Sequence, residues 1–238
     1  SDAITSDERM TAGRGLTEDQ RLDVIMEILE VFTRLWHERA GDGVESFDLI
    51  RLLQRDAHTA NLVNDPKNYI GNLILLIVGG NDTTRNSMSG GVLFLNDFPE
   101  QFERVKADRS LIPSMVSEII RFQTPLSHMR RTVTQDTDFK GHRMKAGDKV
   151  VLWYCSANRD ELVIPNADRF LIDRSGVRNH AAFGFGIHRC MGNRLAEMQL
   201  RIVWEEALKR FASIEVVTPP SRLCHNFVRG YSHMPVRV

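Results

Sequence analysis

Apolar residues recur at helical spacing along most of the chain, and this pattern predicts a mainly helical protein. The polar residues 1–15 predict a loop, and the first apolar stripe then runs from Leu22 to Trp36. Thr17 and Gln20 have the spacing of a capping box, so a helix should begin directly after Thr17. Similar patterns predict further helices, over residues 47–53, 67–96, 113–122 and 193–211, and a turn at residues 97–99 followed by an amphipathic segment through Lys106.

The last predicted helix follows Gly192 and should bury one apolar face against the rest of the protein. The residues near that face are Leu195, Met198, Ile202, Leu208 and Phe211. Before this helix, residues 124–160 alternate between apolar and polar positions and carry turn signals at Gly141 and Gly147. These features predict small β-sheets, so we expect an α+β fold that is mainly α.

The charge balance and the cysteine content narrow the classes of protein that fit. Lys and Arg together number 31, as do Asp and Glu, so no net charge attracts nucleic acid or an anionic membrane. The longest apolar run, Leu73 to Val78, is too short to span a bilayer. Three widely spaced cysteines form no disulfide framework. We therefore expect a cytoplasmic protein that has no membrane span and binds no nucleic acid.

The densest group of chemically informative residues is the stretch 182–195, AFGFGIHRCMGNRL. Gly184, Gly186 and Gly192 allow tight turns and close contact with a planar ligand, because glycine has no Cβ. Cys190 precedes a predicted helix, whose N-terminal N–H groups would stabilise a thiolate. A thiolate in this setting is a strong ligand for haem iron.

Two other interpretations of Cys190 are open. It could be a buried structural cysteine, which is a common fate of a lone thiol. It could also hold zinc together with His180 and His188. Zinc sites usually have four ligands at regular spacings, and Cys155 and Cys224 form no Cys-x-x-Cys pair, so zinc is disfavoured.

Two adjacent glycines lie in the middle of the predicted helix over residues 67–96. Each costs roughly 1 kcal/mol relative to alanine inside a helix, so we expect a ligand to approach Gly79 and Gly80. The Thr83 hydroxyl could bond the Gly79 carbonyl and open the helix locally. The alternative is close helix packing at the glycines, with Asp82 and Thr83 facing solvent.

Glu118 and Arg121 lie three residues apart in the predicted helix over residues 113–122, so their side chains can pair on one face. Most pairs of this kind are surface salt bridges that contribute only about 0–1 kcal/mol to stability. The pair by itself therefore indicates no function.

The pattern Phe-x-x-Gly-x-His-x-Cys-x-Gly over residues 183–192 resembles the haem-binding loop of the cytochrome P450 monooxygenases. The resemblance implies a haem b whose iron is bound by the Cys190 thiolate. It also implies one partial haem domain over residues 1–238, corresponding to about the C-terminal half of the P450 fold. The residues expected to contact haem are Phe183, Gly184, His188, Cys190, Gly192 and, at a propionate, Arg131, with Arg130 as the second choice.

The same resemblance assigns roles to the other motifs. Asp82 and Thr83 match the acid and the alcohol that relay protons during oxygen activation in the family. Glu118 and Arg121 match a buried structural pair that meets an arginine from a later loop, which is Arg169 here. The resemblance also implies an apolar substrate pocket, although its residues could equally be core: Leu73, Ile74, Ile77, Gly80, Leu126 and Met129.

Three stretches, around Gly80, Glu118 and Cys190, resemble the bacterial alkane and fatty-acid terminal hydroxylases of the P450 family. This narrower resemblance implies that one oxygen atom from O2 enters the terminal methyl of an apolar small molecule, a medium-chain alkane or fatty acid. Electrons would come from NAD(P)H through ferredoxin and ferredoxin reductase, since the chain has no Gly-x-Gly-x-x-Gly fingerprint. Arg189 and Arg194 are either part of the docking face for these partners or solvated charges.

Three alternatives to a monooxygenase are open. A haem-thiolate peroxygenase would not need the acid and alcohol pair. A non-catalytic haem-binding or sensor module would use the cysteine without oxygen chemistry, and an incomplete fragment would not hold haem at all.

Overall fold

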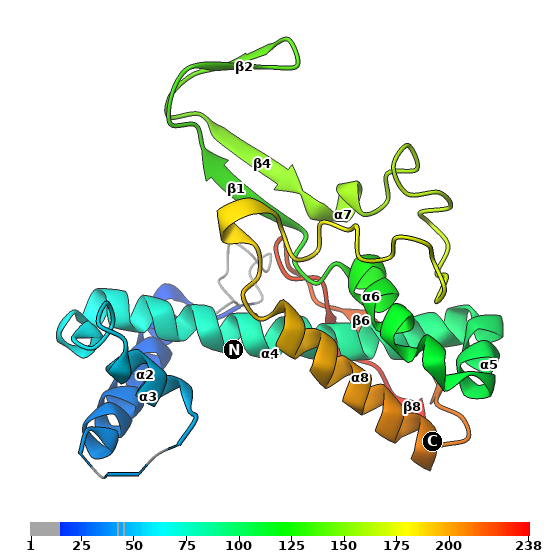
Figure 1. The fold of residues 1–238 in the computed structure, drawn as a ribbon, viewed down its shortest axis with the longest axis horizontal. Coiled ribbons are helices and arrows are strands. Elements are labelled where there is room, and N and C mark those ends of the chain that lie inside the picture. The colour runs from blue at the N-terminus through cyan, green and yellow to red at the C-terminus, as the bar shows by residue number, and fades with distance from the viewer. Residues whose placement is uncertain (1–14, 42, 45) are drawn as a thin grey trace. The chain divides into compact units, whose positions relative to one another are not determined.

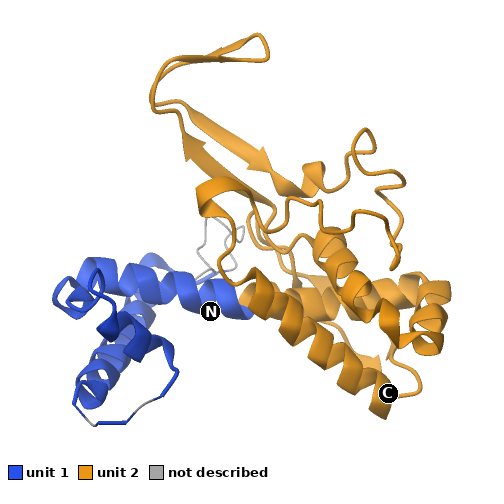
Figure 2. Ribbon diagram, in the orientation of Figure 1, with its two compact units in different colours: residues 1–81 blue, residues 82–238 orange. Residues whose placement is uncertain are grey.

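A computed structural model describes residues 15–41, 43–44 and 46–238 (Figure 1). The chain divides into two compact units, residues 1–81 and residues 82–238 (Figure 2). The long helix α4 (Pro66–Asp97) contributes to both units. The loop expected over residues 1–15 falls, except for Gly15, outside the described residues.

The described part of unit 1 is helical and contains the predicted capping box. The Thr17 side chain accepts a hydrogen bond from the Gln20 N–H at 3.3 Å, and the Gln20 side chain accepts one from the Thr17 N–H at 3.0 Å. This confirms the predicted start of the first helix, because two N–H groups that a helix leaves unsatisfied find side-chain partners. Among the described residues of this unit, the helices before α4 are α2 (Glu18–Arg39), α3 (Leu49–Arg55) and the 3-10 turn η1 (Leu62–Asn64).

The core of unit 1 is a small aromatic and aliphatic cluster. Trp36 and Tyr69 meet edge to face, with ring centroids 5.4 Å apart, and Ile50 and Leu73 pack against them. The Tyr69 hydroxyl donates a hydrogen bond to the Phe32 carbonyl at 2.9 Å, so this buried ring leaves no hydroxyl unsatisfied. The apolar stripe of α2 is thus covered on its Trp36 side.

Unit 2 contains the rest of α4 and the other helices. Pro113 lies in the first turn of α6, as the sequence predicts, because proline lacks only an N–H that a helix start leaves unpaired anyway. Pro99, expected in a turn, is the first residue of α5 for the same reason. Helix α6 ends at Thr124, whose φ of 43° is left-handed. The elements are α5 (Pro99–Ala107), η2 (Arg109–Leu111), α6 (Ile112–Gln123), α7 (Tyr154–Ala157), η3 (Gly186–His188) and α8 (Asn193–Arg210).

The core of unit 2 is built on phenylalanine rings and on the packing of α8 against α6. The rings of Phe94 and Phe122 meet edge to face with centroids 4.7 Å apart, and Phe170 lies 5.6 Å from Phe122. Such aromatic pairs contribute about 0.5–1.5 kcal/mol each beyond the area they bury. They join α4 and α6 to the loop that follows α7.

Helix α8 forms where the pattern predicts it, but of the five residues on the predicted apolar face only Leu208 is buried. Leu195, Met198 and Ile202 are exposed, as is Phe211 beyond the helix end, whereas Leu200, Trp204 and Leu208 are buried. The reason is a gap on α4: a Cβ at Gly91 would lie only 2.8 Å from both the Trp204 ring and the Ile119 side chain. The large indole fills this gap and thereby decides which face of α8 turns inward.

The predicted small sheets are present as four two-stranded antiparallel pairs. The ribbon of β1 and β4 leads into the hairpin of β2 and β3 (Figure 1), where Gly141 and Gly147 both adopt positive φ. The pairs are β1 (His128–Thr132) with β4 (Lys149–Trp153), β2 (Thr137–Phe139) with β3 (His142–Met144), β5 (Glu215–Val216) with β8 (Val236–Arg237), and β6 (Ser221–Arg222) with β7 (Tyr231–His233). The mainly α class with small sheets is confirmed. Of the helices that the structure describes, none has the length and apolar character to cross a membrane.

Candidate functional site

The cysteine loop, residues 183–192, is shaped by two glycines in the left-handed region. Gly184 has φ 67° and Gly186 has φ 71°, while Gly192 has an ordinary φ of −87° and caps α8. A Cβ at Gly184 would lie 3.0 Å from the Tyr154 hydroxyl, so both conformation and space require glycine there. The Cys190 N–H donates to the Phe183 carbonyl at 2.8 Å and closes the loop.

The thiol of this loop is exposed and lies among exposed apolar side chains. Cys190 precedes the cap of α8 by two residues. The exposed fractions of Phe185, Ile187 and Met191 are 87%, 97% and 85%. His188 is also exposed, within η3. The alternative of a buried structural cysteine is therefore wrong for Cys190.

The glycine pair of α4 leaves room for a side chain among the described residues. A Cβ added to Gly79 or Gly80 would meet no described heavy atom within 4 Å, so close helix packing does not explain these residues. Helix α4 continues without interruption from Pro66 to Asp97, so the expected local opening at Thr83 was wrong. The helix tolerates both glycines because the flanking residues keep the hydrogen-bond ladder intact.

Asp82 is buried rather than solvent-facing. Only 1% of its surface is exposed, and its carboxylate pairs with Arg85 one turn later, at 3.4 Å. Thr83, next in the chain, is half-buried, and its carbonyl accepts a hydrogen bond from the Ser87 hydroxyl at 2.8 Å. The acid and the alcohol thus occupy different environments on one helical turn.

One residue expected to line a substrate pocket belongs to a core instead. Leu73 is 2% exposed and packs with Trp36 and Tyr69 in unit 1, so its assignment was wrong. The period of α4 turns Leu73 inward with Tyr69, four residues earlier. The others are half-buried or exposed: Ile74, Ile77, Gly80, Leu126 and Met129.

The two candidate propionate ligands lie on opposite faces of β1. The antiparallel register pairs Met129 with Leu152 and Arg131 with Val150, so Met129 and Arg131 share a face. Arg130 points to the other face, and its carbonyl accepts a hydrogen bond from the Arg131 guanidinium at 2.9 Å. Arg131 is therefore on the side of the ribbon that also carries an expected substrate contact.

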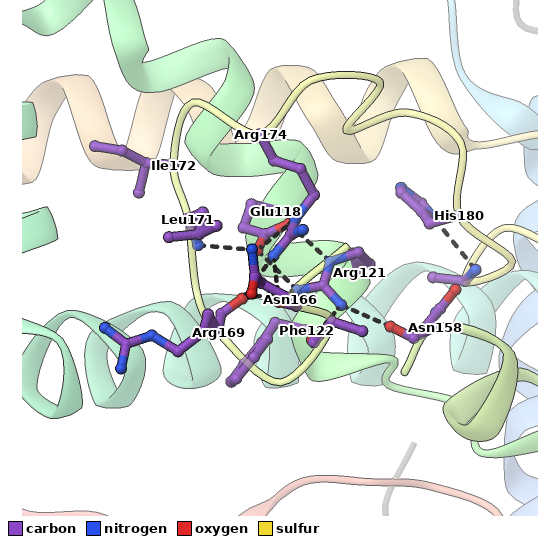
Figure 3. A network of polar contacts seen from close by, with 12 residues as sticks. Glu118, Arg121, Phe122, Asn158, Asn166, Arg169, Leu171, Ile172, Arg174 and His180 are labelled. Atoms are coloured by element: carbon purple, nitrogen blue, oxygen red, sulfur yellow. Dashed lines mark hydrogen bonds and ion pairs between the residues drawn. The ribbon is translucent and has the colours of Figure 1, made fainter. Parts of the chain in front are cut away.

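A buried ion network lies beneath the loops of unit 2 (Figure 3). Glu118 and Arg121 are 0% and 1% exposed, and two nitrogens of Arg121 each lie 2.7 Å from a carboxylate oxygen. The expected pairing of these two residues is confirmed. A bidentate pair of this kind fixes both the distance and the plane of the two groups.

The arginine that joins this pair is Arg174, and the expectation for Arg169 was wrong. The Arg174 Nε lies 3.2 Å and 3.1 Å from the two Glu118 oxygens. Arg169 points away from Glu118 (Figure 3), and its exposed guanidinium lies 3.6 Å from Glu100. Arg169 contributes its carbonyl instead, which accepts from Arg121 at 3.2 Å and from Arg174 at 2.7 Å.

His180 lies before the cysteine loop and is neutral at pH 7. Burial, together with the positive charges of Arg121 and Arg189, lowers its pKa to about 4. The neutral Nδ1 accepts a hydrogen bond from the Ala182 N–H at 3.2 Å. Within the part of the chain that the structure describes, no three His, Cys, Asp or Glu side chains are grouped to hold a metal ion, so these residues offer no zinc site.

Comparison with known proteins decides the family. A family model described as Cytochrome P450 matches residues 23–231. The chain belongs to the cytochrome P450 family. Two curated P450 relatives are the linalool 8-monooxygenase of Pseudomonas putida, 44% identical over 170 residues, and the methyl-branched lipid omega-hydroxylase of Mycobacterium tuberculosis, 43% identical over 166 residues. The solved structure of cytochrome P450-153 from Novosphingobium aromaticivorans is 47% identical, with a TM-score of 0.86.

These P450 matches cover most of this chain but about half, or less, of each relative. The linalool enzyme aligns with 71% of this chain and 42% of its own length. The alignment with the lipid hydroxylase covers 68% of this chain and 38% of the enzyme. The alignment with the solved structure covers 92% of this chain and 54% of the other. The P450 chain thus spans about half the length of the proteins it matches.

The cysteine loop of this P450 chain fits a haem group. It offers one exposed thiol, and haem iron needs a single thiolate from the protein, in contrast to the several ligands of a zinc site. The exposed Phe185, Ile187 and Met191 form an apolar surface of the kind that marks a binding site. At Gly186, a Cβ would meet no described atom within 4 Å, so a flat ligand can approach the backbone there.

Proposed function

We propose that this chain is the haem-thiolate part of a monooxygenase that inserts one oxygen atom from O2 into an apolar substrate. The observation that carries the proposal is the exposed Cys190, which follows the left-handed Gly184 and Gly186 in a loop with exposed apolar side chains. When bound, haem b supplies the activation of O2. Two electrons come from NAD(P)H through ferredoxin and ferredoxin reductase.

The residues of the loop and of β1 hold the cofactor in this proposal. Cys190 supplies the thiolate, while Phe183, Gly184 and Gly192 shape the backbone beside it. His188 and Arg131 bind the propionates, and Arg131 is preferred to Arg130 because it shares a face with Met129. The charge-assisted hydrogen bonds to a carboxylate contribute roughly 1.5–3 kcal/mol each.

Asp82 and Thr83 manage protons in this proposal. Asp82 is buried and paired with Arg85, whose side chain is half exposed, so the acid keeps a polar route toward solvent through its partner. Thr83 offers a hydroxyl one residue later, on a helix that continues unbroken through this point. Proton delivery by a positioned side chain typically raises the reaction rate by about 10²–10⁴-fold.

The proposed substrate is a medium-chain alkane or fatty acid, oxidised at its terminal methyl. Support comes from the aliphatic character of Ile74, Ile77, Leu126 and Met129, and from the relative named a methyl-branched lipid omega-hydroxylase. An aliphatic lining binds hydrocarbon by removing it from water, at about 25 cal/mol per Å² buried.

The direct test loads the chain with haem and records the spectrum of the reduced carbon monoxide complex. A red-shifted Soret band is expected, followed by formation of terminal alcohol with NAD(P)H, ferredoxin and ferredoxin reductase. Absence of haem uptake would contradict the proposal and leave the incomplete-fragment alternative. Equal turnover with peroxide alone, without electron donors, would favour the peroxygenase.

Thr83→Ala is expected to leave haem binding and the Soret band unchanged, yet to divert electrons from substrate to hydrogen peroxide. The reason is that the hydroxyl is not an iron ligand but delivers protons during oxygen activation. The measured quantity is alcohol formed per NAD(P)H consumed, which should fall by about tenfold or more. Thr83→Ser, which keeps the hydroxyl, is the matched control. Equal ratios of alcohol to NAD(P)H in the unaltered chain and in both variants would show that Thr83 has no role in proton delivery.

Gly80→Ala is expected to stabilise the chain while weakening substrate binding. Alanine in an open helical position raises the free energy of unfolding by about 0.8–1 kcal/mol. A methyl group placed into a filled pocket costs about 1–3 kcal/mol of binding free energy, which lowers substrate affinity roughly tenfold. Gly71→Ala is the matched control, because Gly71 lies on the same helix and is equally open. It should give the same stabilisation, measured by urea unfolding, with unchanged substrate affinity. Unchanged affinity in Gly80→Ala would contradict the proposed approach of a ligand.

A further inference from the structure

Asn158 is a buried polar residue that no motif singled out, and all its polar groups are engaged. It is 0% exposed and follows the short helix α7. Its N–H donates to the Tyr154 carbonyl at 2.9 Å, and its carbonyl accepts from the Arg121 guanidinium at 2.6 Å. The backbone of Asn158 is thus tied to the ion network around Glu118 (Figure 3).

The side chain of Asn158 connects two segments that are far apart in the sequence. Its Nδ2 donates to the Thr124 hydroxyl at 2.8 Å, at the end of α6. Its Oδ1 accepts from the Ala181 N–H at 2.7 Å, just before the cysteine loop. The Thr124 hydroxyl donates in turn to the Arg121 carbonyl at 2.6 Å. One amide therefore links the helix of the ion network to the loop that carries the thiol.

The link continues into the cysteine loop through backbone hydrogen bonds. The Ala181 carbonyl accepts from the Gly184 N–H at 2.8 Å, and the Phe183 carbonyl accepts from the Cys190 N–H at 2.8 Å. Helix α7 supplies a second contact to the same place, because the Tyr154 hydroxyl lies 3.0 Å from the position that a Cβ of Gly184 would take. Two groups from one short segment thus constrain residues 181–184.

We propose that Asn158 is a positioning residue that sets the orientation of the cysteine loop, and through it the Cys190 thiolate, relative to the buried ion network. The proposal rests on the proposed function in that the thiolate is a haem ligand. Asn158 touches neither the thiol nor the surface around it. It acts by accepting a hydrogen bond from the Ala181 N–H. Without this buried acceptor, the start of the loop would be released.

The test compares three variants. Asn158→Leu removes both hydrogen-bonding arms at similar size, Asn158→Asp keeps the oxygen that accepts from Ala181, and Asn179→Leu changes an exposed asparagine of the same segment as a control. Amide hydrogen exchange in the haem-free chain should show about tenfold faster exchange at residues 181–190 in Asn158→Leu, with amides of α2 unchanged. Asn158→Asp should restore most of the protection, and Asn179→Leu should match the unaltered chain.

The spectral arm uses the haem-loaded proteins. In Asn158→Leu, a large fraction of the reduced carbon monoxide complex should lose the red-shifted Soret band, and Asn158→Asp should recover it. Uniformly faster exchange throughout the chain, or a full red-shifted band in Asn158→Leu, would overturn the positioning role. If the unaltered chain itself gives no red-shifted band, the proposed function fails instead, while the exchange experiment still decides whether Asn158 orders the loop.

Discussion

Cys190→Ser is expected to abolish the red-shifted Soret band of the reduced carbon monoxide complex. Serine keeps nearly the same size, but its hydroxyl does not ionise to supply the soft, electron-rich ligand that a thiolate provides. Because Cys190 is exposed at the surface of the loop, the substitution creates no cavity and should leave the free energy of unfolding within about 0.5 kcal/mol of the unaltered chain. The effect on the spectrum should therefore be complete and the effect on the fold small.

Cys224→Ser is the matched control for this experiment. Cys224 is also an exposed free cysteine of unit 2, but it lies outside the cysteine loop. Its replacement should leave both the Soret band and the unfolding transition unchanged. A band that survives in Cys190→Ser, or that disappears equally in Cys224→Ser, would contradict the assignment of Cys190 as the haem ligand.

Arg174→Met is expected to destabilise the chain by about 3–5 kcal/mol, because it leaves the Glu118 carboxylate with Arg121 as its remaining guanidinium partner and removes several charge-assisted hydrogen bonds, each contributing roughly 1.5–3 kcal/mol. Arg174 is 7% exposed at its side chain and bonds both oxygens of Glu118. Methionine retains the length and the apolar stem of the side chain, so the loss reports the guanidinium rather than packing. Chemical unfolding followed by circular dichroism measures the change.

Arg169→Met provides the contrast, because the sequence favours Arg169 and the structure favours Arg174. The Arg169 side chain is 61% exposed and pairs only loosely with Glu100 at 3.6 Å. Its removal should cost about 0–1 kcal/mol, the usual value of a surface salt bridge. If Arg169→Met were the more destabilising of the two substitutions, the network described for Glu118 would be wrong.

The local parts of the fold could be predicted from the sequence because they depend on a few neighbouring residues. The capping box at Thr17 and the helix start at Pro113 follow from which N–H groups a helix leaves unpaired. The left-handed glycines of the cysteine loop follow from the absence of a Cβ. In each case the energy that decides the conformation lies within about one turn of the chain.

The parts that could not be predicted depend on contacts between distant segments. The inward face of α8 is decided by the fit of Trp204 into the gap at Gly91, more than a hundred positions earlier. Leu73 has the same aliphatic character whether it lines a pocket or fills a core. The position of Trp36 in the folded chain decides between these two roles. Arg174 and Arg169 are chemically identical, so the path of the intervening loop determines which one reaches Glu118.

The buried network draws most of its hydrogen-bond acceptors from the backbone. The guanidinium of Arg174 donates to the carbonyls of Pro165, Asn166 and Arg169, and that of Arg121 donates to the carbonyl of Ala167. A carbonyl is present whatever side chain its residue carries, so these hydrogen bonds constrain the length of the segment. Its composition is constrained separately at the buried Ala167, Phe170 and Ile172, and at Asn166 with its left-handed φ of 53°. Over evolutionary time the exposed positions of this loop can change, whereas the gain or loss of one residue shifts every acceptor out of place. Gaps within residues 165–174 should therefore weigh more than mismatches when related sequences are aligned.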